Sequence, residues 1–346
     1  MKIIDLFSGV GGLSLGFEMV GFQTKLALDN WNDSIETFNY NRENKVGIVL
    51  EIEEFNKKTI NKFKDEKITG IIGGPPCQGF SSANLSDVSD QGIKINKNRN
   101  KLYLEFYKTV KIINPEFFVI ENVKGLITSQ KGAFVKDINE RFGNLGYKIS
   151  FQVLNAMDYG VPQNRQRVFF VGIKAKNFSF PKKNKRIINC HEALSDLPIN
   201  FKDPADYTSP PLNSYQKLSR KKNSILVNHE NTNHTSNTIK IISKIPDGGS
   251  IKDLPKEYWQ VRKFNKAFQR MNSKEVSHTV DTGHRNYFHY KANRVPSVRE
   301  NARLQSFHDN FIFCGSKTSQ YKQVGNAVPP LLAKALAQKI VKCLKS

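Results

Sequence analysis

The stretch KIIDLFSGVGGLSLGFE, residues 2–18, indicates the fold class because a glycine-rich turn joins an apolar run to a helical pattern. Residues 2–7 have the composition of a buried strand, and residues 13–19 have the periodicity of a helix. Between them, residues 9–12 form a turn whose glycines let backbone N–H groups approach a ligand closely. The stretch therefore predicts the first strand and helix of an α/β sheet, with a ligand site between them.

Short apolar runs repeat this arrangement along the first half of the chain. We expect further strands at residues 24–29, 68–72, 117–120 and 168–171. Strands that alternate with helices predict a doubly wound, Rossmann-like α/β sheet, in which ligands lie beyond the carboxyl ends of the strands. The glycine turn, Asp29, Cys77 and Glu121 all fall at such ends, so we expect them to converge on one crevice.

The composition changes after about residue 182. Basic clusters such as KKNKR and RKK follow, with many Asn and Thr residues and few long periodic segments. Near the C-terminus a Gly-Asn turn and two prolines precede an Ala- and Leu-rich helical pattern. We divide the chain into three parts. Residues 1–180 form the α/β domain, and residues 181–318 form a smaller irregular domain together with a hinge. Residues 319–346 return to the first domain.

The charge of the chain suggests a polyanionic partner. Lys and Arg total 53 against 31 for Asp and Glu, which gives a formal net charge of +22. An excess of this size favours nucleic acid, although a generic basic surface is the alternative.

The cysteines and the apolar runs indicate the compartment. The four cysteines lie far apart without a CxxC pair, so we expect no disulfide framework and no metal site; they are Cys77, Cys190, Cys314 and Cys343. No apolar run reaches the length of a membrane span, and the N-terminus becomes glycine-rich too soon for a signal peptide. We expect a cytoplasmic, reduced protein.

The glycine loop taken alone is a weak signal. It fits NAD, FAD or S-adenosylmethionine, and also a purely structural turn. Gly9, Gly11 and Gly12 do not form a regular GxGxxG pattern, which disfavours a dinucleotide. Asp29 ends the next strand, where its carboxylate would accept hydrogen bonds from a ribose diol.

The segment IIGGPPCQGFS, residues 71–81, presents the lone thiol of Cys77 at a strand end. Two prolines stiffen this loop, whereas a structural cysteine more often lies inside a strand or helix. Glu121, at the end of the apolar strand in FFVIENVKGL, is either a helix cap or a proton donor whose pKa burial would raise. Arg165 and Arg167 alternate in QNRQRVFFVG, which predicts that both point to one face of a strand, near a thiolate, Glu121 or a phosphate.

These segments together resemble the bacterial cytosine-5 DNA methyltransferases of restriction-modification systems. The resemblance covers most of the chain and keeps the motif order of the family. It rests on DLFSGVGG, GGPPCQGFS, ENV, QNRQRVFFVG, RVPSVRENARLQSFHDNF and QVGNAVPPLLAKALA. Asn30, Asn98 and His308 depart from the usual family pattern, but none replaces a catalytic group.

The resemblance implies roles for individual residues. Cys77 matches the nucleophile, Glu121 the acid, and Arg165 and Arg167 the paired arginines. Gln78 and Ser81 match positions near the displaced base. Positions that match the S-adenosylmethionine site are Phe7, Gly9, Gly11, Gly12, Asp29, Asn30, Glu51, Ile52, Pro76, Leu102, Asn326 and Val328.

The family chemistry implies that Cys77 adds to carbon 6 of a cytosine flipped out of duplex DNA, so that carbon 5 accepts the cofactor's methyl group. The base that removes the carbon-5 proton is not identifiable. Residues 181–318 would contact DNA, with Thr279-Val280 and the aromatic stretch 283–290 as candidates. A small buried core is an equal explanation of those aromatics. We expect a monomer, with a restriction endonuclease as its functional pair.

Three other functions remain open from the sequence. A tRNA cytosine-5 methyltransferase would share the catalytic motifs, although the long second domain favours duplex DNA. A non-catalytic DNA-binding homologue would be expected to lose the cysteine, the acid or the glycine loop. A nucleotide-dependent oxidoreductase is disfavoured by the irregular glycine pattern and by the Pro-Pro-Cys loop.

Overall fold

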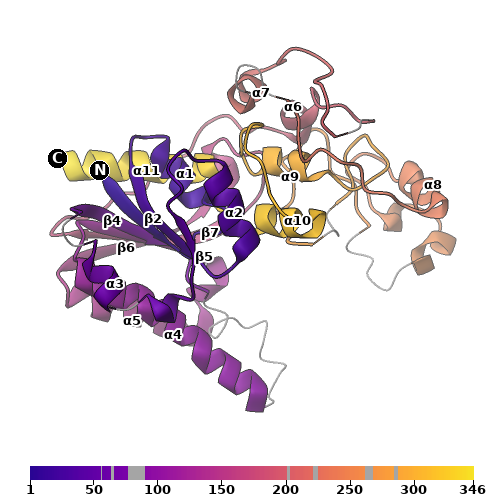
Figure 1. Cartoon of the computed structure of the whole chain (residues 1–346). Coiled ribbons are helices and arrows are strands. Elements are labelled where there is room, and N and C mark those ends of the chain that lie inside the picture. The colour runs from indigo at the N-terminus through magenta and orange to yellow at the C-terminus, as the bar shows by residue number, and fades with distance from the viewer. Residues whose placement is uncertain are drawn as a thin grey trace. The chain divides into compact units, whose positions relative to one another are not determined.

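The computed structural model forms two compact units (Figure 1). It describes residues 1–55, 57–63, 66–76, 90–200, 203–220, 225–261, 268–283 and 287–346. The first unit contains residues 1–155, 166–182 and 332–346, and the second contains residues 156–165 and 183–331.

The first unit is built on a seven-stranded sheet with the order β3-β2-β1-β4-β5-β7-β6. The strands are β1 Lys2–Leu6, β2 Gln23–Asp29, β3 Gly47–Val49, β4 Ile68–Gly73, β5 Phe117–Val123, β6 Tyr147–Asn155 and β7 Gln166–Lys174. Strands β1 to β5 are parallel, whereas β7 runs antiparallel to β5 and β6 runs antiparallel to β7. The predicted α/β class and doubly wound sheet are confirmed, with an antiparallel edge added.

Helices cover both faces of this sheet (Figure 1). The unit contains α1 Gly12–Glu18, α2 Asn32–Tyr40, α3 Lys57–Asn61, α4 Asp90–Ile113, α5 Ala133–Gly143 and most of α11 Pro330–Lys345. Successive side chains of β5 point to opposite faces of the sheet, and both are apolar because helices cover both faces. Phe117 stacks on Phe17 of α1 at 6.1 Å, whereas Phe118 lies 4.2 Å from Phe142 of α5 on the opposite face.

The strand ends differ from the sequence-based bounds at one functional position. The prediction ends the fourth strand at Ile120, but β5 continues through Glu121 to Val123. The extension arises because antiparallel β7 supplies partners, with Glu121 opposite Phe169 and Val123 opposite Arg167. The predicted Gly-Asn turn is also wrong, since Gly325 and Asn326 form the last turn of α10.

The second unit contains short helices joined by long irregular segments. The helices are α6 Cys190–Leu194, α7 Ser214–Ser219, α8 Ser236–Lys244, α9 Val298–Leu304 and α10 Lys317–Asn326. A small apolar cluster includes Ile242, Phe268 and Phe288. Buried ion pairs add to it: Arg303 lies 2.9 Å from Asp196 and also pairs with Asp309. Removal of one partner of such a pair leaves an uncompensated buried charge and is strongly destabilising.

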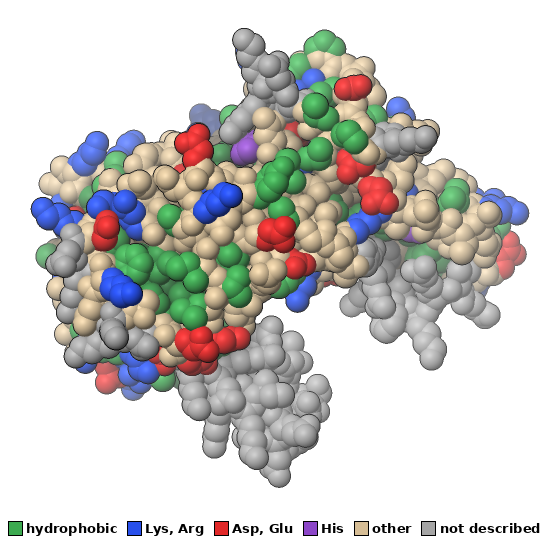
Figure 2. All heavy atoms as spheres, viewed as in Figure 1, with side chains coloured by type: hydrophobic (Ala, Val, Ile, Leu, Met, Phe, Trp, Pro, Cys, Tyr) green, Lys and Arg blue, Asp and Glu red, His purple; other side chains and the backbone are tan. Residues whose placement is uncertain are grey.

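In Figure 2 the described Lys and Arg side chains are scattered over the visible face rather than gathered in one patch. Among the described helices, none combines the length and apolar character needed to cross a membrane.

Candidate active site

The glycine loop joins β1 to α1 in a conformation that uses left-handed backbone angles. Phe7, Gly9 and Gly11 have φ of 58°, 53° and 79°. A Cβ added to Gly9 would meet no atom within 4 Å, so the space beside this residue is open. The loop is anchored at both sides, because Ser8 donates its N–H to the Leu28 carbonyl (3.0 Å) and Gly9 donates to Asp29 Oδ2 (2.8 Å).

Asp29 lies at the carboxyl end of β2 and holds this edge together. Its Oδ1 accepts the Trp31 N–H at 2.9 Å while Oδ2 accepts that of Gly9. Burial raises the pKa of Asp29, and these backbone hydrogen bonds oppose the rise. A carboxylate accepts several hydrogen bonds at once, which suits the hydroxyls of a ribose.

Two further predicted cofactor residues lie beside Asp29. The exposed Asn30 amide donates to both carboxylate oxygens of Glu51 at 3.2 Å. Ile52 is buried at the start of a short 3-10 helix, η1 Ile52–Glu54, and packs in the main apolar cluster of the unit. Leu102 of α4 packs against the same cluster. The structure therefore brings the predicted residues of β1, β2 and the segment after β3 to one edge of the sheet.

Glu121 and Arg167 form an ion pair at the carboxyl end of β5. Arg167 Nε lies 3.0 Å from Glu121 Oε1, and the two side chains are 18% and 14% exposed. The pair forms because β7 is antiparallel, which places Arg167, near its start, diagonal to Glu121 on one face. A Cβ added to Gly74 would lie 3.0 Å from Glu121 Oε2, so glycine at this position leaves room for the carboxylate.

Asn122 has a structural role that sequence reasoning missed. Its buried amide donates to the Pro75 carbonyl at 2.8 Å and so ties the segment after β4 to β5. The segment leads to Pro76, which is partly buried and is the last residue described before the gap. Asn122 stands beside the acid in ENV, but the partner of its amide is 47 positions away, so no local pattern indicates the contact.

Cys77, Gln78 and Ser81 lie outside the described residues. The other three cysteines are free thiols in the described part of the chain. Burial raises the pKa of Cys190 to about 12, which makes this thiol a poor nucleophile at neutral pH.

Arg165 has different hydrogen-bond partners from Arg167 and belongs to the other compact unit. It precedes β7, belongs to the second unit and is 1% exposed. Its guanidinium donates to the carbonyl oxygens of Gly325 (2.8 Å) and Val280 (3.5 Å). The prediction that both arginines lie on one face of a strand is therefore wrong, because β7 begins only at Gln166.

The remaining predicted residues also lie in the second unit. Asn326, at the end of α10, is exposed, and Val328 is buried. Thr279 donates its hydroxyl to the Asn164 carbonyl at 2.7 Å, and Val280 N–H donates to Gln163 at 2.9 Å. In the stretch 283–290, residues 284–286 lie outside the described residues.

The aromatics of that stretch take different positions. Phe288 belongs to the apolar cluster of the second unit, which supports the buried-core explanation for this residue. Tyr287 instead stacks on His278 with ring centroids 3.8 Å apart.

Comparisons with known proteins agree with this arrangement. The type II methyltransferase M.DdeI of Desulfomicrobium norvegicum is 38% identical, over 98% of this chain and 88% of its own. The type II methyltransferase M1.HphI of Haemophilus parahaemolyticus is 36% identical, over 99% of this chain and 87% of its own. A family described as C-5 cytosine-specific DNA methylases matches residues 1–342. The chain belongs to this family.

Solved structures support the family. A prophage-encoded DNA modification methyltransferase of E. coli has a TM-score of 0.81 at 28% identity, with complete coverage of both chains. The S. pombe Dnmt2 methyltransferase has a TM-score of 0.61 at 17% identity and covers 100% of this chain and 98% of its own, which shows a shared fold alone. Membership of the methylase family sets aside the oxidoreductase and the non-catalytic homologue.

Methylases of this family use S-adenosylmethionine as the methyl donor. The first unit fits this nucleoside. Open space at Gly9, acceptor oxygens at Asp29 and apolar side chains at Phe7 and Ile52 meet at one sheet edge. No pyrophosphate needs to be held, which agrees with the irregular glycine spacing.

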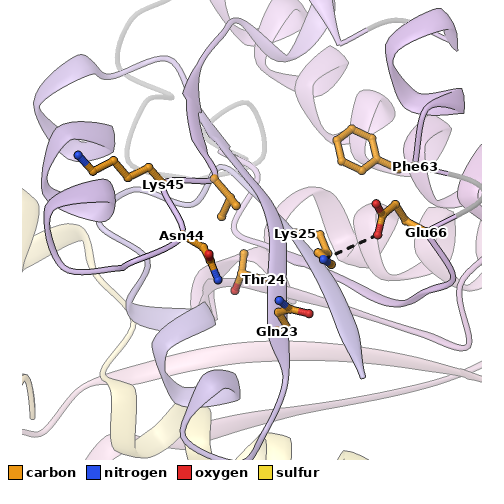
Figure 3. A pocket seen from close by; sticks show the side chains of 8 residues that line it. Gln23, Thr24, Lys25, Asn44, Lys45, Phe63 and Glu66 are labelled. Atoms are coloured by element: carbon orange, nitrogen blue, oxygen red, sulfur yellow. Dashed lines mark ion pairs between the residues drawn. The ribbon is translucent and has the colours of Figure 1, made fainter.

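A hollow of roughly 360 Å³ lies elsewhere on the first unit. Figure 3 shows its polar lining, which includes Thr24, Asn44 and the ion pair of Lys25 with Glu66. These residues lie at or before the amino ends of β2, β3 and β4, away from the carboxyl ends where the glycine loop begins. The hollow is therefore separate from the methylase site.

Proposed function

We propose that this methylase transfers a methyl group to carbon 5 of a cytosine flipped out of a specific duplex DNA sequence, with Cys77 as nucleophile. The observation that carries the proposal is the Glu121–Arg167 pair, which lies beside the Gly74–Pro75 segment that leads to Cys77. The match of the whole chain to a DNA methylase family supports duplex DNA as the substrate.

The first unit would hold S-adenosylmethionine. Asp29 would accept the ribose hydroxyls, and Phe7, Asn30, Glu51 and Ile52 would surround the base. The other proposed contacts are Gly9, Gly11, Gly12, Pro76, Leu102, Asn326 and Val328. When bound, the cofactor supplies a methyl group made electrophilic by its positive sulfonium.

Cys77 and the ion pair at the carboxyl end of β5 would carry the chemistry. The Cys77 thiolate would add to carbon 6 of cytosine, and Glu121 would hold a proton at N3 so that electron density builds at carbon 5. Arg167 would orient the Glu121 carboxylate through its 3.0 Å contact. After methylation, a base or water takes the carbon-5 proton, the electron pair of that bond re-forms the carbon 5–carbon 6 double bond, and the thiolate leaves from carbon 6. Arg165 would contribute to the reaction indirectly, because its guanidinium holds the carbonyls of Val280 and Gly325 in place.

The second unit would contact DNA and choose the cytosine. Thr279, which is exposed, is the proposed reader, whereas Val280 is buried and would only support it. Gln78 and Ser81 would lie near the flipped base. The relatives named type II methyltransferases support a pairing with a restriction endonuclease. That pairing, the monomeric state and a cytoplasmic location are parts of the proposal.

A methyl-transfer assay tests the proposal. Labelled S-adenosylmethionine is incubated with wild type or Cys77→Ser, and with either duplex DNA or tRNA. We expect transfer to duplex DNA by wild type, and no transfer by Cys77→Ser despite retained DNA binding. Near-wild-type turnover by Cys77→Ser would overturn the nucleophile, and transfer to tRNA alone would overturn the substrate.

A further inference from the structure

Arg42 lies two residues after α2, in no segment that the family resemblance uses, yet it contacts the glycine loop. Its Nη2 donates to the Gly11 carbonyl at 3.1 Å and to the Ser14 hydroxyl at 3.4 Å. Its Nε lies 3.1 Å from both carboxylate oxygens of Glu18. The guanidinium also lies 3.7 Å from the centre of the Phe38 ring. One side chain therefore joins α2 to both ends of α1.

The Gly11 carbonyl is the point where these contacts meet. It accepts the first helical hydrogen bond of α1, from Leu15 at 2.8 Å, and also the Ser14 hydroxyl at 3.2 Å. The Arg42 bond is charge-assisted and therefore stronger than either neutral bond. It holds the peptide at the start of α1, where the first backbone N–H groups of a helix have no intrahelical acceptor.

The packing around Gly11 leaves this arrangement little freedom. A Cβ added to Gly11 would lie 2.5 Å from the Phe38 ring and 2.7 Å from Arg42 Nη2. The Arg42 side chain is only 10% exposed, so its bonds are poorly screened by water. The loop backbone rests directly on the guanidinium and the ring.

Arg42 also faces several acidic groups. Burial raises the pKa of Asp5 to about 7, and the Ser14 hydroxyl and Arg42 cation oppose this rise, while Glu18 and Asp29 add to it. Arg42 thus pairs with Glu18 and also acts electrostatically on the buried Asp5 carboxyl.

We propose that Arg42 is a positioning residue that fixes the glycine loop in the conformation that binds S-adenosylmethionine. This role rests on the cofactor site proposed above. Because Arg42 acts on the loop backbone, its loss weakens cofactor binding without changing the reacting groups at the edge of β5.

The test compares Arg42→Gln and Arg42→Lys with wild type and with Arg141→Gln. Arg141 is a matched control, since it also pairs with an acid (Asp137, 2.7 Å) and lies over an aromatic ring (Tyr107, 5.7 Å), on α5. Cofactor Kd is measured by calorimetry, KM and kcat by methyl transfer to duplex DNA, and Tm by thermal unfolding. Asp29→Asn reports separately on the proposed site.

We expect Arg42→Gln to raise the Kd and KM for S-adenosylmethionine about tenfold, as loss of a charge-assisted hydrogen bond implies, with kcat at saturation nearly unchanged. Arg42→Lys should recover part of this affinity, and Arg141→Gln should bind as wild type does. Unchanged Kd in both Arg42 variants would overturn the proposal, even if Tm falls. If Arg42→Gln does not fold, Arg42→Lys decides alone. An unchanged affinity of Asp29→Asn for S-adenosylmethionine would instead overturn the proposed cofactor site. So would the absence of S-adenosylmethionine binding by wild type.

Discussion

Asp5→Asn should increase the free energy of unfolding of the first unit relative to wild type at alkaline pH. This advantage over wild type should be much smaller at acidic pH. Asp5 is 1% exposed in the interior strand β1, and burial raises the pKa of its carboxyl from 3.8 to about 7. A carboxyl of this kind favours its protonated form in the folded state. Asparagine has nearly the same shape and never ionises, so it removes the titration while leaving the packing.

The sign and size follow from the two pKa values. The stabilising contribution of protonated Asp5 is complete below the unfolded pKa of 3.8 and is lost as the pH rises through about 7. A shift of one unit corresponds to about 1.4 kcal/mol, so the full loss is roughly 4 kcal/mol. Between pH 5 and pH 8 the free energy of unfolding of Asp5→Asn, relative to wild type, should rise by roughly 3 kcal/mol.

Two tryptophans allow this to be measured in one unit. Trp31 lies in the first unit and Trp259 in the second, and they are the only two in the sequence. In a Trp259→Phe background, urea unfolding followed by fluorescence reports the first unit alone, which avoids treating two units as one transition. A stability difference between the Asp5 variants that does not change with pH would refute the reasoning, because Asp5 would then remain charged in the folded state.

Two further predictions concern the active site and the DNA face. Gly74→Ala should displace the Glu121 carboxylate, whose Oε2 would lie 3.0 Å from the added Cβ. It should lower kcat for methyl transfer about tenfold with little change in cofactor KM, and an unchanged kcat would argue against a catalytic carboxylate there. DNA affinity should fall steeply as salt rises, with about 10³-fold loss between 50 and 200 mM if six or more phosphates are contacted. A flat salt profile in a filter-binding assay would contradict a phosphate-contacting surface.

The sequence predicted the parts of the fold that have local signals. The strands at β1, β2, β4 and β5 combine apolar runs with glycine or proline at their ends, and each was placed within three residues of its observed bounds. Strand β3 was missed because three residues are too few for a periodic pattern. Strand β6 was missed because much of it is exposed, so its hydrophobic signal is weak.

The residues that the sequence misplaced or did not indicate depend on long-range contacts. Arg165 and Arg167 are two residues apart, but β7 begins between them. Arg165 therefore donates to backbone carbonyls, whereas Arg167 pairs with Glu121. Asn122 bonds a carbonyl 47 positions away, and Arg42 bonds one 31 positions away. Neither contact leaves a spacing pattern, so only the folded chain reveals it.

Bisulfite sequencing of DNA from cells that express the protein would show directly whether it methylates cytosine in DNA. We expect cytosines in one short sequence context to resist conversion at nearly every occurrence, and expression of Cys77→Ser to leave all of them convertible. Complete conversion in cells that contain folded wild-type protein would contradict cytosine-5 methylation of DNA by this chain.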